Sequence, residues 1–466
     1  MKKTLIFSTI AAMFASLFGC SGNKAVVDES MTKVVHPEWS RNAVIYEVNW
    51  RQSTENGTLA EYTEQLPRLK ELGVDILWFM PIHPISEVNR KGELGSYYAV
   101  RDYKDVNPEL GTLEEFKTFV KKAHEMGMKV ILDWVPNHSG CDNAWLTEHP
   151  DWYVYDENGN FVSPYDWTDT YKFDYSNLEM RKGMIDALSF WLRDVDVDGF
   201  RCDVAGEVPT DFWNEARPQL NAVKSDIFML AEASVPELEK EAFDMAYNWP
   251  MKDLFNQIAA TAGFNTCPEN HTYPTKYAVD IDTLLAEQAA AYPKDSYMMN
   301  MTSNHDMNSW EGTEFERLGS LSSAFAVLTY TIPGMPLIYT GQETGLDRRL
   351  EFFIKDKAPD WTIDEYFNFY KTLNELKHSQ KALAAGIAGG EMVRYPTESN
   401  DLYVFSRTKD ESNVIVMVNL GAEEQNVVFK DKAPEIKDNC INFFTKEKAA
   451  LPEVLASGEY LVFVEN

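Results

Sequence analysis

The sequence predicts an α/β fold, a closed (β/α)8 barrel (TIM barrel) followed by a C-terminal antiparallel β-sandwich domain. Short apolar runs recur up to residue 339 and alternate with segments whose apolar residues are spaced three and four apart. No glycine-rich phosphate loop follows the first run, which disfavours the alternative of an open doubly wound sheet. After about residue 385 the pattern changes to strands separated by polar turns.

The predicted barrel strands are short and mostly apolar. They are 44–48, 76–80, 129–133, a run leading into 200–201, 227–230, 243–246, 297–301 and 336–339. Helices are predicted at 62–72, 113–126, 180–193 and 318–330. Gly73 and Gly127 predict helix ends that lead into the next strands. Strands and helices that alternate in this way favour a parallel barrel.

Spacing and composition divide the chain further. The third and fourth strands are about twice as far apart as one β–α unit requires. We therefore expect an insertion at 139–177 within a barrel domain that spans 39–384. The C-terminal β domain is expected at 385–466, with strands at 402–405, 414–418, 427–429 and 460–464.

The N-terminus is typical of an export signal. Lys2 and Lys3 precede an apolar run, 5–18, that is too short to span a bilayer as a stable helix. The run ends in LFGC, which resembles a bacterial lipobox with Cys20 as the lipidated residue; a plain signal peptide with an incidental cysteine is the alternative. The expected segments are a signal peptide at 1–19 and a lipidated tether at 20–38. The protein would then be lipid-anchored in the cell envelope, at the outer membrane, facing the periplasm or the cell surface.

Charge and composition limit the partners. The formal net charge of −30 at pH 7 would repel nucleic acid and anionic lipid surfaces, so we expect membrane contact only through the lipid anchor. The chain has 13% aromatic residues, which serve either core packing or stacking against sugars. The cysteines have no metal-type spacing and specify no disulfide. We expect a monomer.

One stretch carries the first chemical signal. In GFRCDVAGEV, residues 199–208, Arg201 and Asp203 are two apart on a strand and project to the same face. A fixed cation keeps a neighbouring carboxylate charged, which suits a nucleophile or an electrostatic stabiliser. Taken alone, the pair could equally be an ordinary buried ion pair.

Other strand ends supply partners. Glu232 follows the fifth strand, Asp306 follows the seventh, and the third ends in DWVPNH with His138. In a parallel barrel these ends face one pocket. Each acid has a simpler explanation: Asp203 as a salt-bridge partner, Glu232 as a helix N-terminal charge and Asp306 as a helix N-cap. A single active site explains all three together.

A carboxylate pair is what glycosidic bond cleavage requires. Asp203, beside Arg201, is the better nucleophile. Glu232 follows an apolar strand, where desolvation would raise its pKa and keep it protonated as an acid. His138 and His305 would donate hydrogen bonds to sugar hydroxyls, although capping or loop packing would also explain them.

At these residues the chain resembles the α-amylase family of glycoside hydrolases. The resemblance covers nearly the whole mature chain and keeps the order of the motifs. The motifs are VIYEVNWRQ (44–52), GSYYAVRDYKDVNPELGT (95–112), DWVPNH (133–138), FDYSN (173–177), GFRCDVA (199–205), AE (231–232), NHD (304–306) and GMPLIYTGQE (334–343).

The resemblance implies a retaining mechanism and a set of roles. Asp203 would be the nucleophile that forms a glycosyl-enzyme, Glu232 the general acid/base, and Asp306 the transition-state stabiliser. Residues lining the same sugar subsite would be Tyr98, which stacks, together with His138, Arg201 and His305. Asn137 and Asp174 match family ligands of a structural Ca²⁺, an ion that prefers oxygen ligands; Asn137 could equally hydrogen-bond within its loop.

Departures from the family pattern bear on the substrate. Ala99 and Ser309 stand where members that cut terminal glucose often carry Asp and Arg, and Gly206-Glu207 replaces a common Lys-His. We expect hydrolysis of α-1,4-glucosidic bonds in starch, glycogen or maltodextrin. The alternatives are a transglycosylase on the same glucans and a non-catalytic glucan-binding lipoprotein, which the intact carboxylates disfavour. Endo or exo action and cleavage of α-1,6 branches stay open.

Overall fold

A closed parallel barrel forms the body of the protein, as predicted. The computed structural model describes residues 30–267 and 273–465. Eight strands close in the order β1-β10-β9-β8-β7-β6-β3-β2. They are β1 (Ile45–Val48), β2 (Ile76–Phe79), β3 (Lys129–Trp134), β6 (Gly199–Cys202), β7 (Phe228–Ala231), β8 (Met245–Tyr247), β9 (Tyr297–Asn300) and β10 (Met335–Tyr339). Each of them overlaps or adjoins a run that the sequence identified.

The barrel strands are buried on both faces, which explains why they read as continuous apolar runs. Side chains alternate along each strand, so that one set fills the barrel and the other packs beneath the helices. Ile45 packs inside the barrel with Trp78 and Ile131. Tyr46 and Val48 belong to the outer core under the helices.

Helices surround the barrel. The longer ones are α4 (Leu113–Glu125), α6 (Leu178–Phe190), α7 (Thr210–Val223), α9 (Trp249–Thr261), α10 (Asp280–Ala291), α12 (Ser322–Thr331) and α13 (Glu365–Ser379). The shorter ones are α1 (Trp50–Ser53), α2 (Leu59–Thr63), α3 (Leu66–Leu72), α5 (Trp145–Glu148), α8 (Leu238–Glu241) and α11 (Glu314–Leu318). A capping box between Thr112 and Glu115 starts α4. Gly73, with φ of 92°, ends α3 in the left-handed region.

Three predicted helices differ in detail. The α-helix expected at 318–330 begins only at Ser322, after a 3-10 turn over Gly319–Leu321. The helix expected at 62–72 is divided into α2 and α3, because Pro67 stands in the first turn of a new helix. The helix expected at 180–193 is α6, which continues as a short π-helical turn over Trp191–Val195. That turn ends at Asp196, which has a positive φ of 67°, and the chain then enters β6.

The insertion after the third strand contains a small sheet of its own. β4 (His138–Gly140) and β5 (Thr170–Lys172) pair antiparallel, with His138 opposite Lys172. The helix α5 lies between them in the chain. The described strands thus begin and end close to the predicted limits, 139–177.

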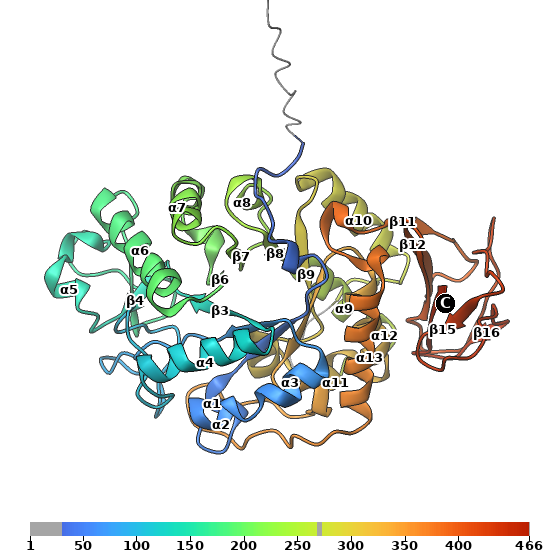
Figure 1. Cartoon of the computed structure of the whole chain (residues 1–466), viewed down its shortest axis with the longest axis horizontal. Coiled ribbons are helices and arrows are strands. Elements are labelled where there is room, and N and C mark those ends of the chain that lie inside the picture. Colours follow the sequence, from blue (N-terminus) through green and yellow to red (C-terminus); the bar gives the residue numbers. More distant parts are fainter. Residues whose placement is uncertain (1–29, 268–272, 466) are drawn as a thin grey trace, which may run out of the picture.

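The C-terminal part is an antiparallel β domain beside α12 and α13 (Figure 1). Its main sheet has five strands, β11 (Glu391–Arg394), β12 (Leu402–Lys409), β13 (Ser412–Asn419), β17 (Tyr460–Glu465) and β15 (Cys440–Asn442); β14 (Gln425–Asn426) pairs with β16 (Val454–Leu455). Tyr403 and Phe405 join the barrel core, whereas Leu402 and Val404 face a separate core. The predicted limit between 384 and 385 falls in the segment that connects α13 to β11.

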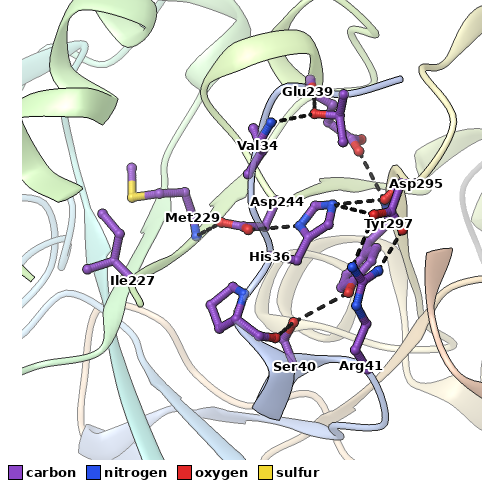
Figure 2. A network of polar contacts seen from close by, with 12 residues as sticks. Val34, His36, Ser40, Arg41, Ile227, Met229, Glu239, Asp244, Asp295 and Tyr297 are labelled. Carbon is purple, nitrogen blue, oxygen red and sulfur yellow. Dashed lines mark hydrogen bonds and ion pairs between the residues drawn. The ribbon is translucent and has the colours of Figure 1, made fainter. Parts of the chain in front are cut away.

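An N-terminal segment, residues 31–41, crosses the end of the barrel where the strands begin. Figure 2 shows His36 between the side chain of Asp244 and Asp295. His36 Nδ1 lies 2.9 Å from Asp244 Oδ1, and Nε2 lies 2.9 Å from the Asp295 carbonyl oxygen. Arg41 donates to Asp295 Oδ1 over 2.6 Å. The described part of the predicted tether is therefore packed against the barrel rather than extended away from it.

The expectations for the export signal concern other residues. The signal peptide at 1–19 and the lipidated Cys20 lie outside the described residues. Among the described helices, none has the length and apolar character needed to cross a membrane. Cys141, Cys202, Cys267 and Cys440, the cysteines of the described ranges, are free thiols.

Candidate active site

Three acidic side chains lie together at the C-terminal ends of the barrel strands. Asp203 follows β6, Glu232 follows β7, and Asp306 lies shortly after β9. All three line one cavity of about 380 Å³. The parallel strands all point to this end of the barrel, which is why residues distant in sequence meet there. The structure thus brings together the three carboxylates singled out in the sequence; their chemical roles stay predictions.

The buried Arg201 side chain contacts two of these carboxylates and a further acid, Asp133. Its side chain is fully buried, and Nη1 donates to Asp133 Oδ1 over 2.8 Å and to Asp203 Oδ1 over 3.0 Å. Nη2 forms an ion pair with Glu232 Oε2 at 2.9 Å. From the sequence, Arg201 was expected to contact Asp203 alone. The guanidinium is instead shared by three acids, because Asp133 on the neighbouring strand β3 faces the same interior.

Sharing one cation leaves the acids incompletely compensated. Burial raises the pKa of Asp203 well above its usual value; the nearby Glu232 charge adds to this effect, and Arg201 opposes it. Burial likewise raises the pKa of Asp133 to about 6, against the attraction of Arg201 and His305. Arg201 favours the charged form of Asp203, as expected from the sequence, but desolvation is the larger effect in the free protein.

Glu232 is held by a strained backbone. Val204, directly after Asp203, has φ of 39° and ψ of 44°, in the left-handed region that β-branched residues avoid. Its N–H donates to Glu232 Oε2 over 2.7 Å. Glu232 is therefore not enclosed by apolar groups alone, as the position after an apolar strand suggested. A conformation of this kind costs on the order of 1–3 kcal/mol and persists only where its surroundings enforce it.

Tyr98 and His305 form one wall of the cavity. Their rings stack with centroids 5.5 Å apart, and the Tyr98 hydroxyl lies 2.8 Å from His305 Nε2. The same hydroxyl donates to Asp133 Oδ2 over 3.2 Å. His305 Nε2 is 3.3 Å from Asp306 Oδ1. The two residues predicted to bind the sugar are thereby linked to the carboxylates.

His138 lines the cavity from the insertion side. Burial lowers its pKa to about 3, so the imidazole is neutral at ordinary pH and keeps one N–H to donate. Its ring lies against Trp167, with centroids 5.3 Å apart. This position is compatible with the predicted contact to a sugar.

The residues matched to Ca²⁺ ligands lie near each other at the junction of barrel and insertion, where Phe173 N donates to the Asn137 carbonyl oxygen over 3.1 Å. Asp174 Oδ1, however, already accepts hydrogen bonds from the backbone N–H and the hydroxyl of Ser176. Across the described residues, no group of three or more His, Cys, Asp or Glu side chains could hold a metal ion. Asn137 and Asp174 alone do not make a complete ligand set, and the calcium expectation stays a prediction.

The structure adds residues to the cavity that the sequence argument missed. Lys91 and Asp169 form an ion pair at 3.2 Å that links the loop after β2 to the insertion. Aromatic residues on the rim are Trp167, Trp310, Phe352 and Phe353. Trp310 lies in a short π-helical turn, Met307–Glu311, and the others lie on loops, so no periodicity marked them and only the general excess of aromatic residues indicated them.

Comparison with protein families identifies the class of the barrel. The family model of the α-amylase catalytic domain matches residues 41–360. The chain therefore belongs to the α-amylase family, as the motifs predicted.

Solved structures agree in fold. An α-amylase from Lactobacillus plantarum is 30% identical, covers 92% of this chain and 100% of its own, and has a TM-score of 0.78. A noncanonic maltogenic α-amylase, AmyB from Thermotoga neapolitana, is 29% identical, covers 91% and 98%, and has a TM-score of 0.79. Among curated sequences, α-amylase MalA of Haloarcula japonica is 26% identical over 84% of this chain. The chain spans 57% of the length of that relative.

Proposed function

We propose that the protein is a retaining glycoside hydrolase that cleaves α-1,4-glucosidic bonds in starch, glycogen or maltodextrin. The proposal rests on one observation: Asp203, Glu232 and Asp306 all line one cavity of an α-amylase-family barrel. Relatives named α-amylase and maltogenic α-amylase support an α-glucan as substrate.

The proposed reaction has two displacements. Asp203 attacks the anomeric carbon, and the bond from that carbon to the leaving oxygen breaks as Glu232 gives the oxygen a proton. Glu232 then takes a proton from water, which attacks the anomeric carbon and releases Asp203. Asp306 and His305 contact the reacting sugar, and the Asp306 carboxylate stabilises the positive charge that develops on its ring.

The distinction between nucleophile and acid rests on the family resemblance. Arg201 contacts both Asp203 and Glu232, at 3.0 Å and 2.9 Å, so the guanidinium alone does not separate their roles. Because the acids interact closely, their titration belongs to the cluster as a whole. In the reacting complex we assign the mobile proton to Glu232 and the anion to Asp203.

The rim of the cavity suits a glucan chain longer than one sugar. Tyr165, whose ring packs against the cavity-lining Trp167, exposes 67% of its surface, and Trp310, which lines the cavity, exposes 48%. Exposed rings offer stacking surfaces for the apolar faces of sugars. The hydroxyl of Ser309 donates to the Leu350 carbonyl oxygen, so this position contributes no charge to a clamp on a terminal glucose. Both features favour substrates that continue past the cleaved bond.

Maltoheptaose tests the proposal. The wild-type protein should release shorter maltooligosaccharides and new reducing ends. In Asp203→Asn and in Glu232→Gln, kcat should fall by about 10²- to 10⁴-fold. The circular dichroism and Tm of both variants should show a folded protein. Near wild-type turnover by either variant would contradict the assigned roles. Redistribution of chain lengths without new reducing ends would identify a transglycosylase instead.

The lipid anchor and Ca²⁺ remain proposals of the sequence. We propose that Cys20 carries a lipid that holds the protein in the cell envelope. Labelled palmitate should enter the wild-type protein but not Cys20→Ala; equal labelling of both would exclude this anchor.

For Ca²⁺, a chelator should lower the Tm of the wild-type protein but not that of Asp174→Ala. An unchanged Tm in the wild-type protein would argue against the ion.

A further inference from the structure

We propose that Glu47, on β1, is a positioning residue of the active site that fixes His305 with both ring nitrogens facing acceptors. Glu47 is completely buried in the barrel and does not line the cavity. Its Oε1 lies 2.5 Å from His305 Nδ1. The inference rests on the proposed function, because His305 matters here as a group beside the reacting sugar.

The hydrogen-bond chain determines how His305 is protonated. The Tyr98 hydroxyl donates its single proton to Asp133 Oδ2, so it can only accept from His305 Nε2. Nε2 therefore carries a hydrogen. On the other side of the ring, the short contact between Nδ1 and Glu47 Oε1 requires a proton between them. Taken together, the ring and Glu47 hold one proton more than a neutral imidazole beside a carboxylate would.

Charge favours placing this proton on the ring. Burial works against a charged His305, but Asp306 and Glu47 outweigh it and raise the His305 pKa to about 9. Burial raises the pKa of Glu47, which the attraction of His305 and Arg201 opposes. The other titratable or charged groups around the pair are Arg201, Asp133, Asp306, Tyr98, Tyr247 and Tyr339.

The consequence is a cationic donor beside Asp306. A charged His305, 3.3 Å from Asp306 Oδ1, attracts that carboxylate and keeps it in place beside the reacting sugar. A neutral ring that donates from Nε2 to Tyr98 would leave an ionised Glu47 without a donor. Glu47 Oε2 has no hydrogen-bond partner, so Oε1 and His305 account for its placement.

The test is Glu47→Gln in the full-length protein. The amide keeps the shape of the side chain and removes its charge. NMR titration of the His305 ring, assigned by its loss in His305→Gln, should move from about 9 towards the ordinary value of about 6.5. With maltoheptaose, kcat should fall by about 10-fold or more, KM should change less, and the alkaline limb of the pH profile should move to lower pH.

Glu343→Gln is the matched control. Glu343 is also completely buried, but it contacts Tyr46 and Arg68 on the outer side of the barrel. It should leave the His305 titration and the pH profile unchanged even if it lowers the Tm. An unshifted His305 titration in Glu47→Gln would overturn the inference. The NMR titration of His305 does not depend on enzyme activity. A protein that does not hydrolyse glucans would therefore refute the proposed function, but the effect of Glu47→Gln on the His305 pKa could still be measured.

Discussion

At the active site, one buried cation serves several acids. Arg201 contacts Asp133, Asp203 and Glu232, and its single charge cannot balance all three. Burial raises the pKa of Asp133 to about 6, and it raises the pKa of Asp203 well above its usual value. The pH dependence of activity should therefore report protons of the whole cluster and not the ionisation of one residue.

His305 gives the stability of the protein a defined pH dependence. Its pKa is about 9 in the folded protein and about 6.5 when unfolded, so the folded state binds the proton more tightly. Its contribution is fully present below about pH 6.5 and is lost as the pH rises through 9. The loss should be on the order of 3 kcal/mol in the free energy of unfolding.

Urea unfolding at several pH values measures this effect. The fall in stability between pH 6.5 and 9 should be smaller in His305→Asn than in the wild-type protein. His83→Asn is the control, because burial lowers the pKa of His83 to about 4 and keeps it neutral throughout this window. An identical pH dependence of His305→Asn and the wild-type protein would show that His305 is not protonated there.

At the scale of elements, the N-terminal segment fastens loops at the strand-entry end of the barrel. His36 contacts Asp244, which also accepts from Arg217 Nη1 over 2.8 Å, and it contacts the backbone of Asp295 (Figure 2). These loops precede β8 and β9. The segment thus adds side-chain contacts between the loops that precede two neighbouring strands, β8 and β9.

Removing His36 should loosen this end. His36→Ala leaves Asp244 and a carbonyl oxygen with fewer partners in a buried place, at a cost of about 2 kcal/mol. Hydrogen exchange should then increase over residues 31–41, and the midpoint of urea unfolding should fall. Val35→Ala, next to it and with 84% of the Val35 surface exposed, should change neither. Equal effects of the two substitutions would contradict the role of His36.

At the scale of the molecule, the barrel could be predicted because its strands have two buried faces. Runs such as 76–80 are apolar throughout, and glycines such as Gly73 mark the ends of the helices. The division of 62–72 into two helices was missed because apolar periodicity continues across the break at Gln65. The docking of residues 31–38 was missed because this segment is too polar and short to show a pattern.

The positions of the candidate site residues followed from strand ends, but their electrostatics did not. Sequence spacing places Asp203 beside Arg201, yet it does not reveal that Asp133 and Glu232 compete for the same guanidinium. The strained Val204 has no sequence signal, because valine favours strands rather than the left-handed region. Glu47 looked like one more strand residue, since its partner His305 is 258 positions away.

The central claim is that Asp203 is the nucleophile, and covalent trapping tests it most directly. Maltosyl fluoride has a leaving group that needs no acid, so Glu232→Gln should form the glycosyl-enzyme and hydrolyse it slowly. Intact-protein mass spectrometry should show one added maltosyl group, and peptide mapping should locate it on Asp203. The double variant with Asp203→Asn should show none. An adduct on another residue, or a product of inverted anomeric configuration, would contradict the account.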